Sequence, residues 1–250
     1  MFYIHSDLRF ATDKQIDLRS NLNYLKSIFG KPLIFPVYNY EYSKSRVFNV
    51  YNDISQLGQM NEFIRNEKEY ERTIFPVFSD CYHKSIKFNQ DINLELTPFS
   101  NDSFFSFLSK NDGKIVHYGS NLRSTTYIHY LEDKFFNGKV PYRYQKKFPG
   151  KVIIGNDTIK VKCRFHVCPA GLKLRYNVDA IFQHMIKYKL VELIQGKKSR
   201  IFWFNVNEFE NVVFSFLQKD PFALLDDDSK VVAKQICNNL GREVLYTDFE

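Results

Sequence analysis

The sequence predicts an α/β fold with a central mixed sheet flanked by helices. In the first 150 residues, short apolar runs alternate with longer mixed segments, as strands joined by helices do. The 250 residues are 44% hydrophobic, which is enough for one substantial core. From about residue 150 the pattern changes to a β-hairpin and helices, with no Gly/Ser-rich linker before it. We therefore expect residues 1–150 to form the core and residues 151–250, the hairpin and helical part, to complete the same domain.

The elements of the first part follow from their periodicity and from the residues that interrupt it. Leu22, Leu25 and Ile28 recur at mostly helical spacing, and Gly30 ends that pattern. Ser55 is a possible N-cap for a later helix. We predict strands at 2–4, 32–37 and 114–118, an extended segment at 73–79, and helices at 14–29 and 55–64.

The second part begins with a hairpin around the turn Gly155-Asn156-Asp157. Its second arm alternates, so one face carries Ile159, Val161, Cys163, Phe165 and Val167, and the other carries Lys160, Lys162, Arg164 and His166. The basic face fits a solvated surface and an anion-binding role equally well. A helix at 177–195, a strand at 200–204 and two further helices should pack on the first part and close the core.

Charge and aromatic content leave several partner classes open. The net charge of +7 comes from 35 Lys and Arg against 28 Asp and Glu, and it attracts phosphate-bearing cofactors, nucleotide-linked substrates or nucleic acid. The 25 Phe and 16 Tyr are compatible with base stacking but fit ordinary packing better. Because no RNA- or DNA-binding motif is recognisable, we expect no nucleic-acid partner.

The cysteines and the hydropathy of the sequence indicate which redox state, metal sites and membrane segments to expect. Cys81, Cys163, Cys168 and Cys237 form no C-x-x-C pair and are few for a disulfide-rich fold, which predicts reduced thiols. Cys163 falls on the opposite strand face from His166 and Cys168, so we expect no metal site. No window approaches eighteen uncharged apolar residues, and the start has no signal-peptide pattern. We expect a cytoplasmic protein without membrane insertion.

The segment from Ser124 to Glu132, STTYIHYLE, is the best candidate for catalysis. If Ser124 to Thr126 cap a helix, His129 and Glu132 lie together beside its buried stripe. A neighbouring carboxylate fixes the tautomer of a histidine and stabilises the imidazolium, which prepares a general base. Many helices carry the same spacing as a surface pair, so spacing alone leaves both interpretations open. Phosphate loops, dinucleotide fingerprints, nucleophile elbows and H-E-x-x-H are absent.

Five segments of the first part match a set of motifs in order. Residues 2–8 (FYIHSDL) match V-H-S-S-L, and residues 33–40 (LIFPVYNY) match L-V-M-P-T-F-T-Y. Residues 48–64 match F-D-x-x-x-T-P-S-x-x-G-A-L-x-E-x-F, residues 118–132 match G-V-G-x-x-x-x-T-x-x-H-x-x-E, and residues 140–143 match V-P-Y-R. With these motifs the sequence resembles the antibiotic (aminoglycoside 3-N-) acetyltransferase family of coenzyme A-dependent N-acyltransferases, in particular its surface-sugar branch. The resemblance implies an acyltransferase core at 1–150 with acyl-CoA (acetyl-CoA or a hydroxyacyl-CoA) as co-substrate and no metal.

The match is incomplete at the family motif R-S-x-H-P-x-H-S, where this chain has RTIFPVFS at 72–79. Phe75 and Phe78 replace the histidines of the motif, so a mechanism through those histidines does not apply here. His129 then remains the best-placed base. Gln56 stands where a basic residue is frequent, and the last hundred residues resemble the family only loosely.

The resemblance implies direct attack of an amino-sugar nitrogen on an acyl thioester. His129 would be the base, Glu132 would orient it, and Thr126 would cap the helix or hold the base. Backbone N–H groups near Ser6 and Asp7 would meet the thioester oxyanion. The residues implied for coenzyme A binding are Ser6, Asp7, Ser55 and Gly58.

The acceptor class follows from charge. A nucleotide-linked amino sugar suits a basic protein better than a polycationic aminoglycoside does. Tyr142, Arg143 and Tyr144, with the Lys160/Lys162/Arg164 face, are candidates to hold its diphosphate or base. We therefore predict an acyl-CoA-dependent N-acyltransferase that acts on a nucleotide-linked amino sugar in surface polysaccharide (O-antigen or capsule) biosynthesis. An aminoglycoside 3-N-acetyltransferase that confers antibiotic resistance and a catalytically inactive binding member of the family are the alternatives, and a homodimer is left open.

Overall fold

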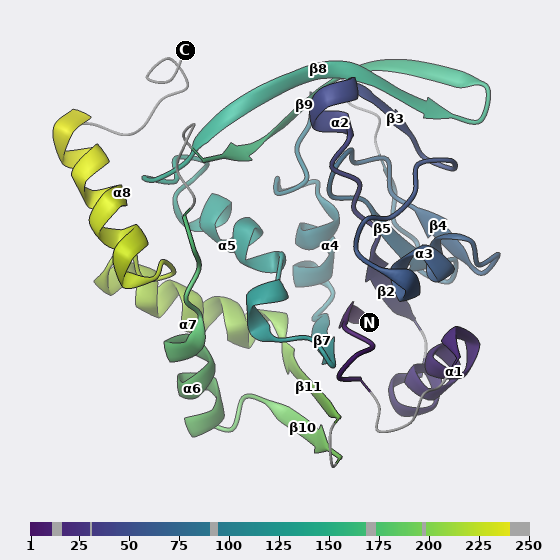
Figure 1. Cartoon of the computed structure of the whole chain (residues 1–250), viewed down its shortest axis with the longest axis horizontal. Helices are drawn as coiled ribbons and strands as arrows, with labels where there is room; N and C mark the ends of the chain where they lie inside the picture. The colour runs from purple at the N-terminus through teal and green to yellow at the C-terminus, as the bar shows by residue number, and fades with distance from the viewer. Residues whose placement is uncertain (12–16, 31, 91–94, 169–173, 197–198, 241–250) are drawn as a thin grey trace.

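The computed structural model describes residues 1–11, 17–30, 32–90, 95–168, 174–196 and 199–240. Within these residues a seven-stranded sheet has helices on both faces (Figure 1). Its strands run in the order β10 (Glu192–Gln195), β11 (Arg200–Asn205), β7 (Lys114–Tyr118), β1 (Phe2–Ser6), β2 (Leu33–Pro36), β5 (Asp80–His83) and β4 (Tyr70–Arg72). β7, β1 and β2 are parallel, and the remaining pairs are antiparallel. The predicted α/β fold with a central mixed sheet is confirmed.

The three parallel strands fix the position of the functional edge. They are short apolar runs, as buried parallel strands usually are. β1 pairs with β7 from Phe2 opposite Lys114 to Ser6 opposite Tyr118, and it pairs with β2 on its other side. The carboxyl ends of all three strands therefore lie at one edge of the sheet, which is where α/β folds place their ligands.

The sheet separates two apolar cores. Neighbouring residues of β1 point to opposite faces, so Tyr3 and Ile4 belong to different cores. The Ile4 side packs against α1 (Leu18–Phe29) and α3 (Gln59–Arg65). The Tyr3 side packs against α4 (Phe104–Lys110), α5 (Tyr127–Phe135), α6 (Asp179–Lys187) and α7 (Val206–Lys219). α8 (Asp227–Leu240) lies outside these layers, beyond α7 in Figure 1.

Helix α1 has an N-cap, a buried apolar face and a terminating glycine, all of which are visible in its sequence. Asp17 caps its start by accepting a hydrogen bond from the Ser20 backbone N–H at 3.0 Å. Leu22 and Leu25 are fully buried against the sheet, and Gly30 ends the helix with φ 67°. The predicted beginning of this helix, at residues 14–16, lies outside the described residues.

Two predicted boundaries are wrong in the first part. Helix α3 begins after Gly58, which has φ 112°, so Ser55 is not its N-cap. The Ser55 hydroxyl instead accepts from the Leu57 backbone N–H at 3.3 Å, in a turn that precedes the helix. The segment 73–79 is not extended either, because Val77 has φ 70° and the Phe78 N–H bonds the Pro76 carbonyl in a γ-turn.

The predicted helix at 177–195 is also wrong in its second half. α6 ends at Lys187, and Lys189 adopts φ 58° just beyond it. The Lys189 and Leu190 backbone N–H groups bond the carbonyls of Ile186 and Met185, which is a Schellman ending. The chain then reverses into the edge strand β10, which pairs with β11.

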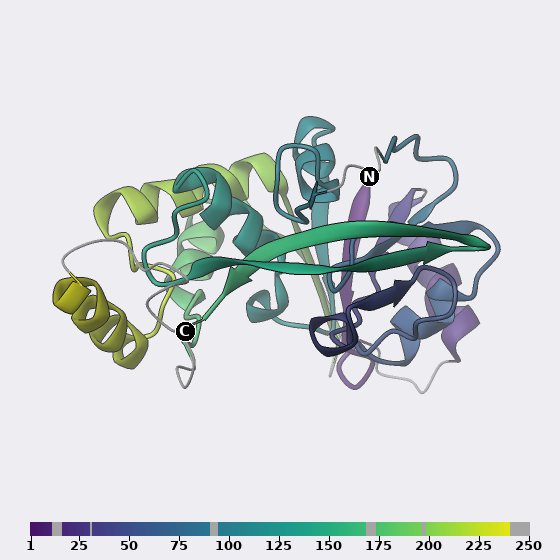
Figure 2. The same cartoon turned by 90° about the horizontal axis from the view of Figure 1, so that it is seen from above.

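A second, four-stranded sheet lies along one side of the molecule, and its long hairpin runs across the view from above (Figure 2). It contains β3 (Val47–Asn49), the long hairpin strands β8 (Tyr144–Ile154) and β9 (Asp157–Val167), and β6 (Glu95–Leu96). Cys163 and Phe165 are buried on one face of β9 while Lys160 and Lys162 are exposed on the other, as the alternation predicts. β8 begins at Tyr144, so the division that we predicted near residue 150 falls inside a strand.

The remaining helical segments are short. α2 (Tyr42–Ser45) precedes β3, and the 3-10 turn η1 (Leu122–Ser124) links β7 to α5. Among the described helices, none has both the length and the apolar composition needed to cross a membrane.

Candidate active site

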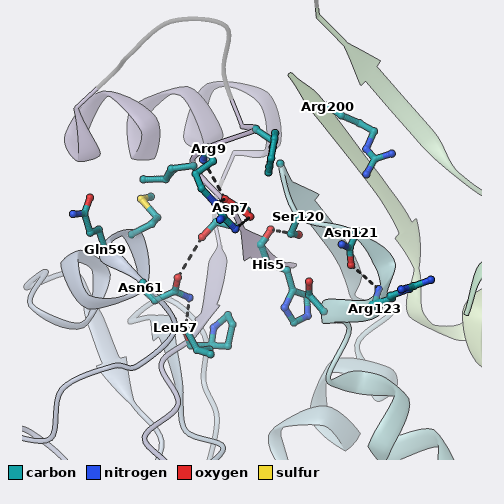
Figure 3. A pocket seen from close by; sticks show the side chains of 18 of the residues that line it. His5, Asp7, Arg9, Leu57, Gln59, Asn61, Ser120, Asn121, Arg123 and Arg200 are labelled. Carbon is teal, nitrogen blue, oxygen red and sulfur yellow. Dashed lines mark hydrogen bonds and ion pairs between the residues drawn. The ribbon is translucent and has the colours of Figure 1, made fainter. Parts of the chain in front are cut away.

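A cleft of about 1070 Å³ opens at the carboxyl ends of β1, β2 and β7 (Figure 3). Ser6 and Asp7 follow β1, Tyr38 follows β2, and Gly119 and Ser120 follow β7 along its wall. The start of α3 and the loop before β11 complete the lining. The cleft therefore lies where the strand order predicts a ligand site.

Gly119 allows two loops of the cleft to meet. Its φ is 74°, and a Cβ built on it would lie 2.2 Å from the Asp7 carbonyl oxygen. Only a residue without a side chain fits both this conformation and this close approach. The Asp7 N–H donates to the Tyr118 carbonyl at 2.8 Å, which locks the loop after β1 against the end of β7.

His129 and Glu132 form the hydrogen-bonded pair that their spacing predicts. The distance from His129 Nδ1 to Glu132 Oε2 is 2.9 Å. Glu132 is 1% exposed, whereas 24% of the His129 side chain remains exposed. The imidazole lies edge-on to the rings of Phe99 and Tyr176, with centroids 5.8 and 5.3 Å away. One end of the pair is therefore buried and the other can meet a ligand.

Glu132 is held as a carboxylate by several donors. The Tyr142 hydroxyl donates to Oε1, and the Tyr176 hydroxyl lies 2.7 Å from both carboxylate oxygens. Burial opposes ionisation, but His129 and the Arg143 charge outweigh it and lower the pKa of Glu132 to about 2. Because an ionised carboxylate only accepts hydrogen bonds, His129 Nδ1 carries the hydrogen and Nε2 keeps its lone pair.

The pKa of His129 lies below its ordinary value. Burial lowers it most and the Arg143 charge lowers it further, while the hydrogen bond and charge of Glu132 act in the opposite direction. The imidazole is therefore neutral at pH 7, as a general base must be.

A small pocket of about 80 Å³ lies between His129 and the cleft lining. It is lined by His129, Tyr176, Thr126 and residues of η1. Arg123, Ser124 and Thr126 line both the pocket and the cleft. His129 therefore lies in a pocket that shares these three residues with the cleft.

Thr126 does not cap α5, which corrects one of its two predicted roles. The turn η1 runs directly into the helix, so Thr126 already has helical angles (φ −63°, ψ −24°) and its side chain makes no capping bond. Thr126 instead lines both the cleft and the small pocket.

The residues predicted to bind coenzyme A divide into two groups. Ser6, Asp7 and Gly58 line the cleft, whereas Ser55 does not and is buried in the turn before α3. The Asp7 N–H cannot meet an oxyanion as predicted, because it is committed to Tyr118. The Asp7 carboxylate pairs with Arg9 at 2.7 Å (Figure 3).

The residues predicted to hold the acceptor lie on the buried side of Glu132. Tyr142 is buried on Glu132, and Arg143 lies over the Tyr176 ring at 5.1 Å. Tyr144 opens strand β8 and is also buried. None of the three lines the cleft or the small pocket; Tyr142 and the Arg143 charge act on Glu132 instead.

The sequence analysis missed two buried clusters beside the cleft. His5 and His117 stack with ring centroids 5.2 Å apart, and His117 bonds the hydroxyls of Ser120 (2.8 Å) and Thr125 (3.0 Å). The other cluster joins Tyr3, Tyr38 and Asp80. Both clusters contain polar residues that lie on predicted strands or directly after them. In an α/β fold this position indicates a residue close to the ligand site, so the sequence could have pointed to both clusters. Arg9, Arg123 and Arg200 around the cleft carried no such signal (Figure 3).

Other candidates are not supported. Burial raises the pKa of the Cys81 thiol to about 12, so it is not an activated nucleophile. Phe75 is buried, and Phe78 packs against Tyr38 and Phe165, so both replacements serve the core. No cluster of metal ligands occurs among the described residues.

Comparisons with known proteins agree with this geometry. The family model described as aminoglycoside 3-N-acetyltransferase matches residues 36–218. A search of curated proteins gave no match. The fold is similar to AAC-IIIb solved as a binary complex with CoASH (TM-score 0.71, 14% identity, covering 87% of this chain and 89% of that one).

Two further solved structures share the fold. A mutant of aminoglycoside acetyltransferase AAC(3)-IVa in complex with apramycin has a TM-score of 0.67 at 13% identity and covers 89% of this chain and 86% of that one. The YokD protein from Bacillus subtilis has a TM-score of 0.65 at 12% identity and covers 88% and 87%. The match of the family model over most of the chain and the common fold lead to one assignment. The chain belongs to the aminoglycoside 3-N-acetyltransferase family and is an N-acyltransferase that uses acyl-CoA.

Proposed function

We propose that this enzyme transfers an acetyl group from acetyl-CoA to an amine of an amino sugar, with His129 as the general base. The observation that carries the proposal is the 2.9 Å bond between His129 and the buried, ionised Glu132, beside a cleft large enough for a cofactor-sized molecule. We also propose that residues 1–150 and 151–250 act as one domain, in the cytoplasm.

The residues support direct transfer. His129 Nε2 takes a proton from the amine nitrogen while that nitrogen attacks the thioester carbonyl carbon. A C–N bond forms and the C–S bond breaks, and the proton passes from the imidazolium to the departing coenzyme A thiolate. Glu132 stabilises the imidazolium during this interval. A base in this position contributes roughly 10²–10⁴ in rate.

The acyl-CoA would occupy the large cleft. Its phosphates suit a wall that carries Arg9, Arg123 and Arg200. Ser6 adds a hydroxyl to the same wall, and Gly58 leaves open space beside it. The acyl end would then lie near Thr126, where the cleft joins the small pocket.

An aminoglycoside is the favoured acceptor. The family model carries that description, and a solved protein of the same fold is a complex with apramycin. The acceptor amine would enter the small pocket between Thr126 and His129.

A nucleotide-linked amino sugar of surface polysaccharide synthesis is the second candidate. Among the described residues that line the cleft and pocket, the charged side chains are Asp7 and three arginines, and Asp7 is already paired with Arg9. Such a basic lining suits a diphosphate. The phosphates of acyl-CoA suit the same arginines equally well. The basic lining therefore supports a nucleotide-linked acceptor only if acyl-CoA and the acceptor both contact these arginines.

The test is release of free coenzyme A thiol from acetyl-CoA and 3-hydroxybutyryl-CoA. The acceptor panel contains apramycin, one uridine-diphosphate amino sugar and one thymidine-diphosphate amino sugar, with mass spectrometry of each acceptor. We expect turnover and a mass gain of one acyl group on apramycin. Turnover with a nucleotide sugar alone would support the second candidate, and no acylated acceptor in any arm would contradict the proposed function.

A further inference from the structure

His5 is a buried histidine of the cleft wall that the mechanism described above does not use. It lies near the end of β1, lines the cleft and is 5% exposed (Figure 3). Its Nε2 atom is enclosed and has no hydrogen-bond partner among the described residues. Its Nδ1 atom also makes no hydrogen bond to the described residues, but it is not one of the enclosed atoms. Nδ1 is therefore the ring nitrogen that a molecule in the cleft can contact.

Neighbouring side chains fix the His5 ring. It stacks on His117 with ring centroids 5.2 Å apart, and the Tyr3 ring meets it edge-on, also at 5.2 Å. His117 is itself held by hydrogen bonds to Ser120 (2.8 Å) and Thr125 (3.0 Å). The Ser120 hydroxyl also donates to the His5 carbonyl at 2.9 Å. The ring is therefore in place before a ligand binds.

Burial sets the charge and the tautomer of His5. It lowers the pKa of His5 to about 3, so at pH 7 the imidazole is neutral and carries one N–H. Orphaned N–H groups are rarer in protein interiors than orphaned acceptors. We therefore assign the lone pair to the enclosed Nε2 and the hydrogen to Nδ1. In this form His5 offers one hydrogen-bond donor to the cleft.

The donor lies at the end of the cleft near the catalytic base. The His5 side chain is on the face of β1 that α5 covers, and α5 carries His129. Thr125, which bonds His117, directly precedes Thr126. Thr126 lines both the cleft and the small pocket that holds His129. A thioester bound at Thr126 therefore lies near both His5 and His129.

Acyl transfer needs a donor in this part of the cleft. Attack on the thioester places a negative charge on the carbonyl oxygen, and hydrogen-bond donors aimed at that oxygen stabilise it. The backbone N–H groups of Asp7 and Gly119 are committed to backbone carbonyls. The Ser6 hydroxyl donates to Asn61 Oδ1 at 3.3 Å. The Nδ1–H of His5 is free of such a commitment among the described residues.

We propose that His5 is a further catalytic residue, which donates its Nδ1–H to the thioester oxygen and stabilises the oxyanion that forms there. The inference deepens the proposed N-acyl transfer and rests on it. A neutral imidazole can polarise a carbonyl in this way. As the amine nitrogen attacks, the π electrons of the C=O bond move to the oxygen, and they re-form the carbonyl as the C–S bond breaks. The amine proton passes through His129 to the thiolate, so His5 neither gains nor loses a proton.

Isotope-edited infrared spectroscopy of bound acetyl-CoA, labelled with ¹³C at the acetyl carbonyl, tests the contact without an acceptor. A hydrogen bond to the thioester oxygen weakens the C=O bond, so we expect the labelled band at lower frequency on the wild type than in solution. His5→Phe keeps a ring that can stack on His117 but removes the donor, and it should return the band to its solution position. His5→Asn places an N–H donor near the position of Nδ1 and should retain part of the shift. His184→Asn is the control, because His184 lies on α6 outside the lining of the cleft and the small pocket.

Thiol release with the best acceptor of the panel gives the kinetic counterpart. We expect His5→Phe to lower kcat about a hundredfold, as loss of one oxyanion donor does. The KM for acetyl-CoA should change little, because the bond strengthens in the transition state. His5→Asn should lose less than His5→Phe, and His184→Asn should match the wild type. Thermal unfolding identifies a general loss of structure, and His5→Leu is a second donor-free variant if Phe destabilises the fold.

Three results would overturn the inference. The first is a labelled band at the same frequency on the wild type and on His5→Phe. The second is a folded His5→Phe enzyme whose kcat stays within about threefold of the wild type. The third is a shift that survives His5→Phe but is lost in Tyr38→Phe, since Tyr38 also lines the cleft. If the shift depends on His5 and yet no acceptor is acylated, the proposed function fails while the contact of His5 with the thioester stands.

Discussion

Glu132 is the residue on which the candidate catalytic pair depends. It is buried and ionised, and its charge and hydrogen bond raise the pKa of His129 against the opposing effects of burial and Arg143. Tyr142 and Tyr176 hold it in place from two different segments. The pair is therefore preorganised before any ligand binds.

Replacing Glu132 by Gln tests this dependence. The amide keeps the shape but removes the charge, so the pKa of His129 should fall further and the imidazolium should be less stable. We expect kcat to fall roughly 10- to 100-fold while the acid limb of the pH–rate profile moves to lower pH. Profiles of kcat and of kcat/KM between pH 5 and 8 measure the fall in rate and the position of the acid limb. An acid limb that stays in place would show that Glu132 does not set the His129 titration; Tyr176→Phe, which keeps the charge, is the control.

His5 gives the protein a sensitivity to acid. Burial lowers its pKa from 6.5 to about 3. Between those values the unfolded chain binds a proton that the folded chain does not, so the free energy of unfolding falls as pH falls below 6.5. Over the 1.5 pH units from 6.5 to 5 this amounts to about 2 kcal/mol.

Urea unfolding at pH 6.5 and pH 5 isolates this contribution as a difference between two proteins: the change in the free energy of unfolding should be more unfavourable in the wild type than in His5→Asn by about this amount. Asp80 acts with the opposite sign, because its raised pKa makes protonation favour the folded state as pH falls. It is present in both proteins and cancels from the comparison. Equal losses in the two proteins would mean that His5 is not buried in its neutral form.

At the level of elements, the loop after β7 is the part most sensitive to substitution. In Gly119→Ala the new Cβ would meet the Asp7 carbonyl and the Ala11 nitrogen, at a φ that alanine disfavours. We expect a loss of about 2–4 kcal/mol in the free energy of unfolding, from strain and overpacking together. Gly155→Ala is the matched control, because Gly155 has φ 60° and open space around it, and it should lose only about 1 kcal/mol. Denaturant unfolding of the two variants decides, and equal losses would argue against the close approach of the two loops.

Sequence periodicity predicts some elements and misses others for physical reasons. β1, β2 and β7 are continuous apolar runs, so their positions follow directly. The end of α6 does not, because its left-handed residue is Lys189 and no glycine marks it. The edge strand β10 is exposed along its length and lacks an apolar face to reveal it.

The candidate site was predictable only where its residues are close in sequence. His129 and Glu132 are three apart on one helix, which spacing alone brings together. Tyr176 lies 44 residues from Glu132 and reaches it only because the chain returns after the hairpin. Tyr3, Tyr38 and Asp80 meet through strand pairing across the sheet, which no local pattern encodes.

At the scale of the whole molecule, the net charge of +7 should affect binding of acetyl-CoA mainly through the basic residues around the cleft. Arg9, Arg123 and Arg200 surround the cleft, and Arg200 is exposed there. We predict that Arg200→Gln raises the KM for acetyl-CoA about two- to fivefold, with a smaller effect at high salt, as exposed ion pairs behave. Lys160→Gln on the exposed hairpin face makes the same change in net charge away from the cleft and should leave that KM unchanged. Equal effects of the two substitutions would mean that net charge, and not the cleft, attracts the co-substrate.

The most direct measurement is thiol release from acetyl-CoA in the presence of the best acceptor, comparing the wild type with His129→Asn. Asparagine retains a polar side chain but cannot accept the proton. We predict that release by the variant falls at least about a hundredfold, with an unchanged unfolding midpoint and unchanged acetyl-CoA binding. A folded His129→Asn protein that releases thiol within a few-fold of the wild-type rate would contradict the assignment of His129 as the base.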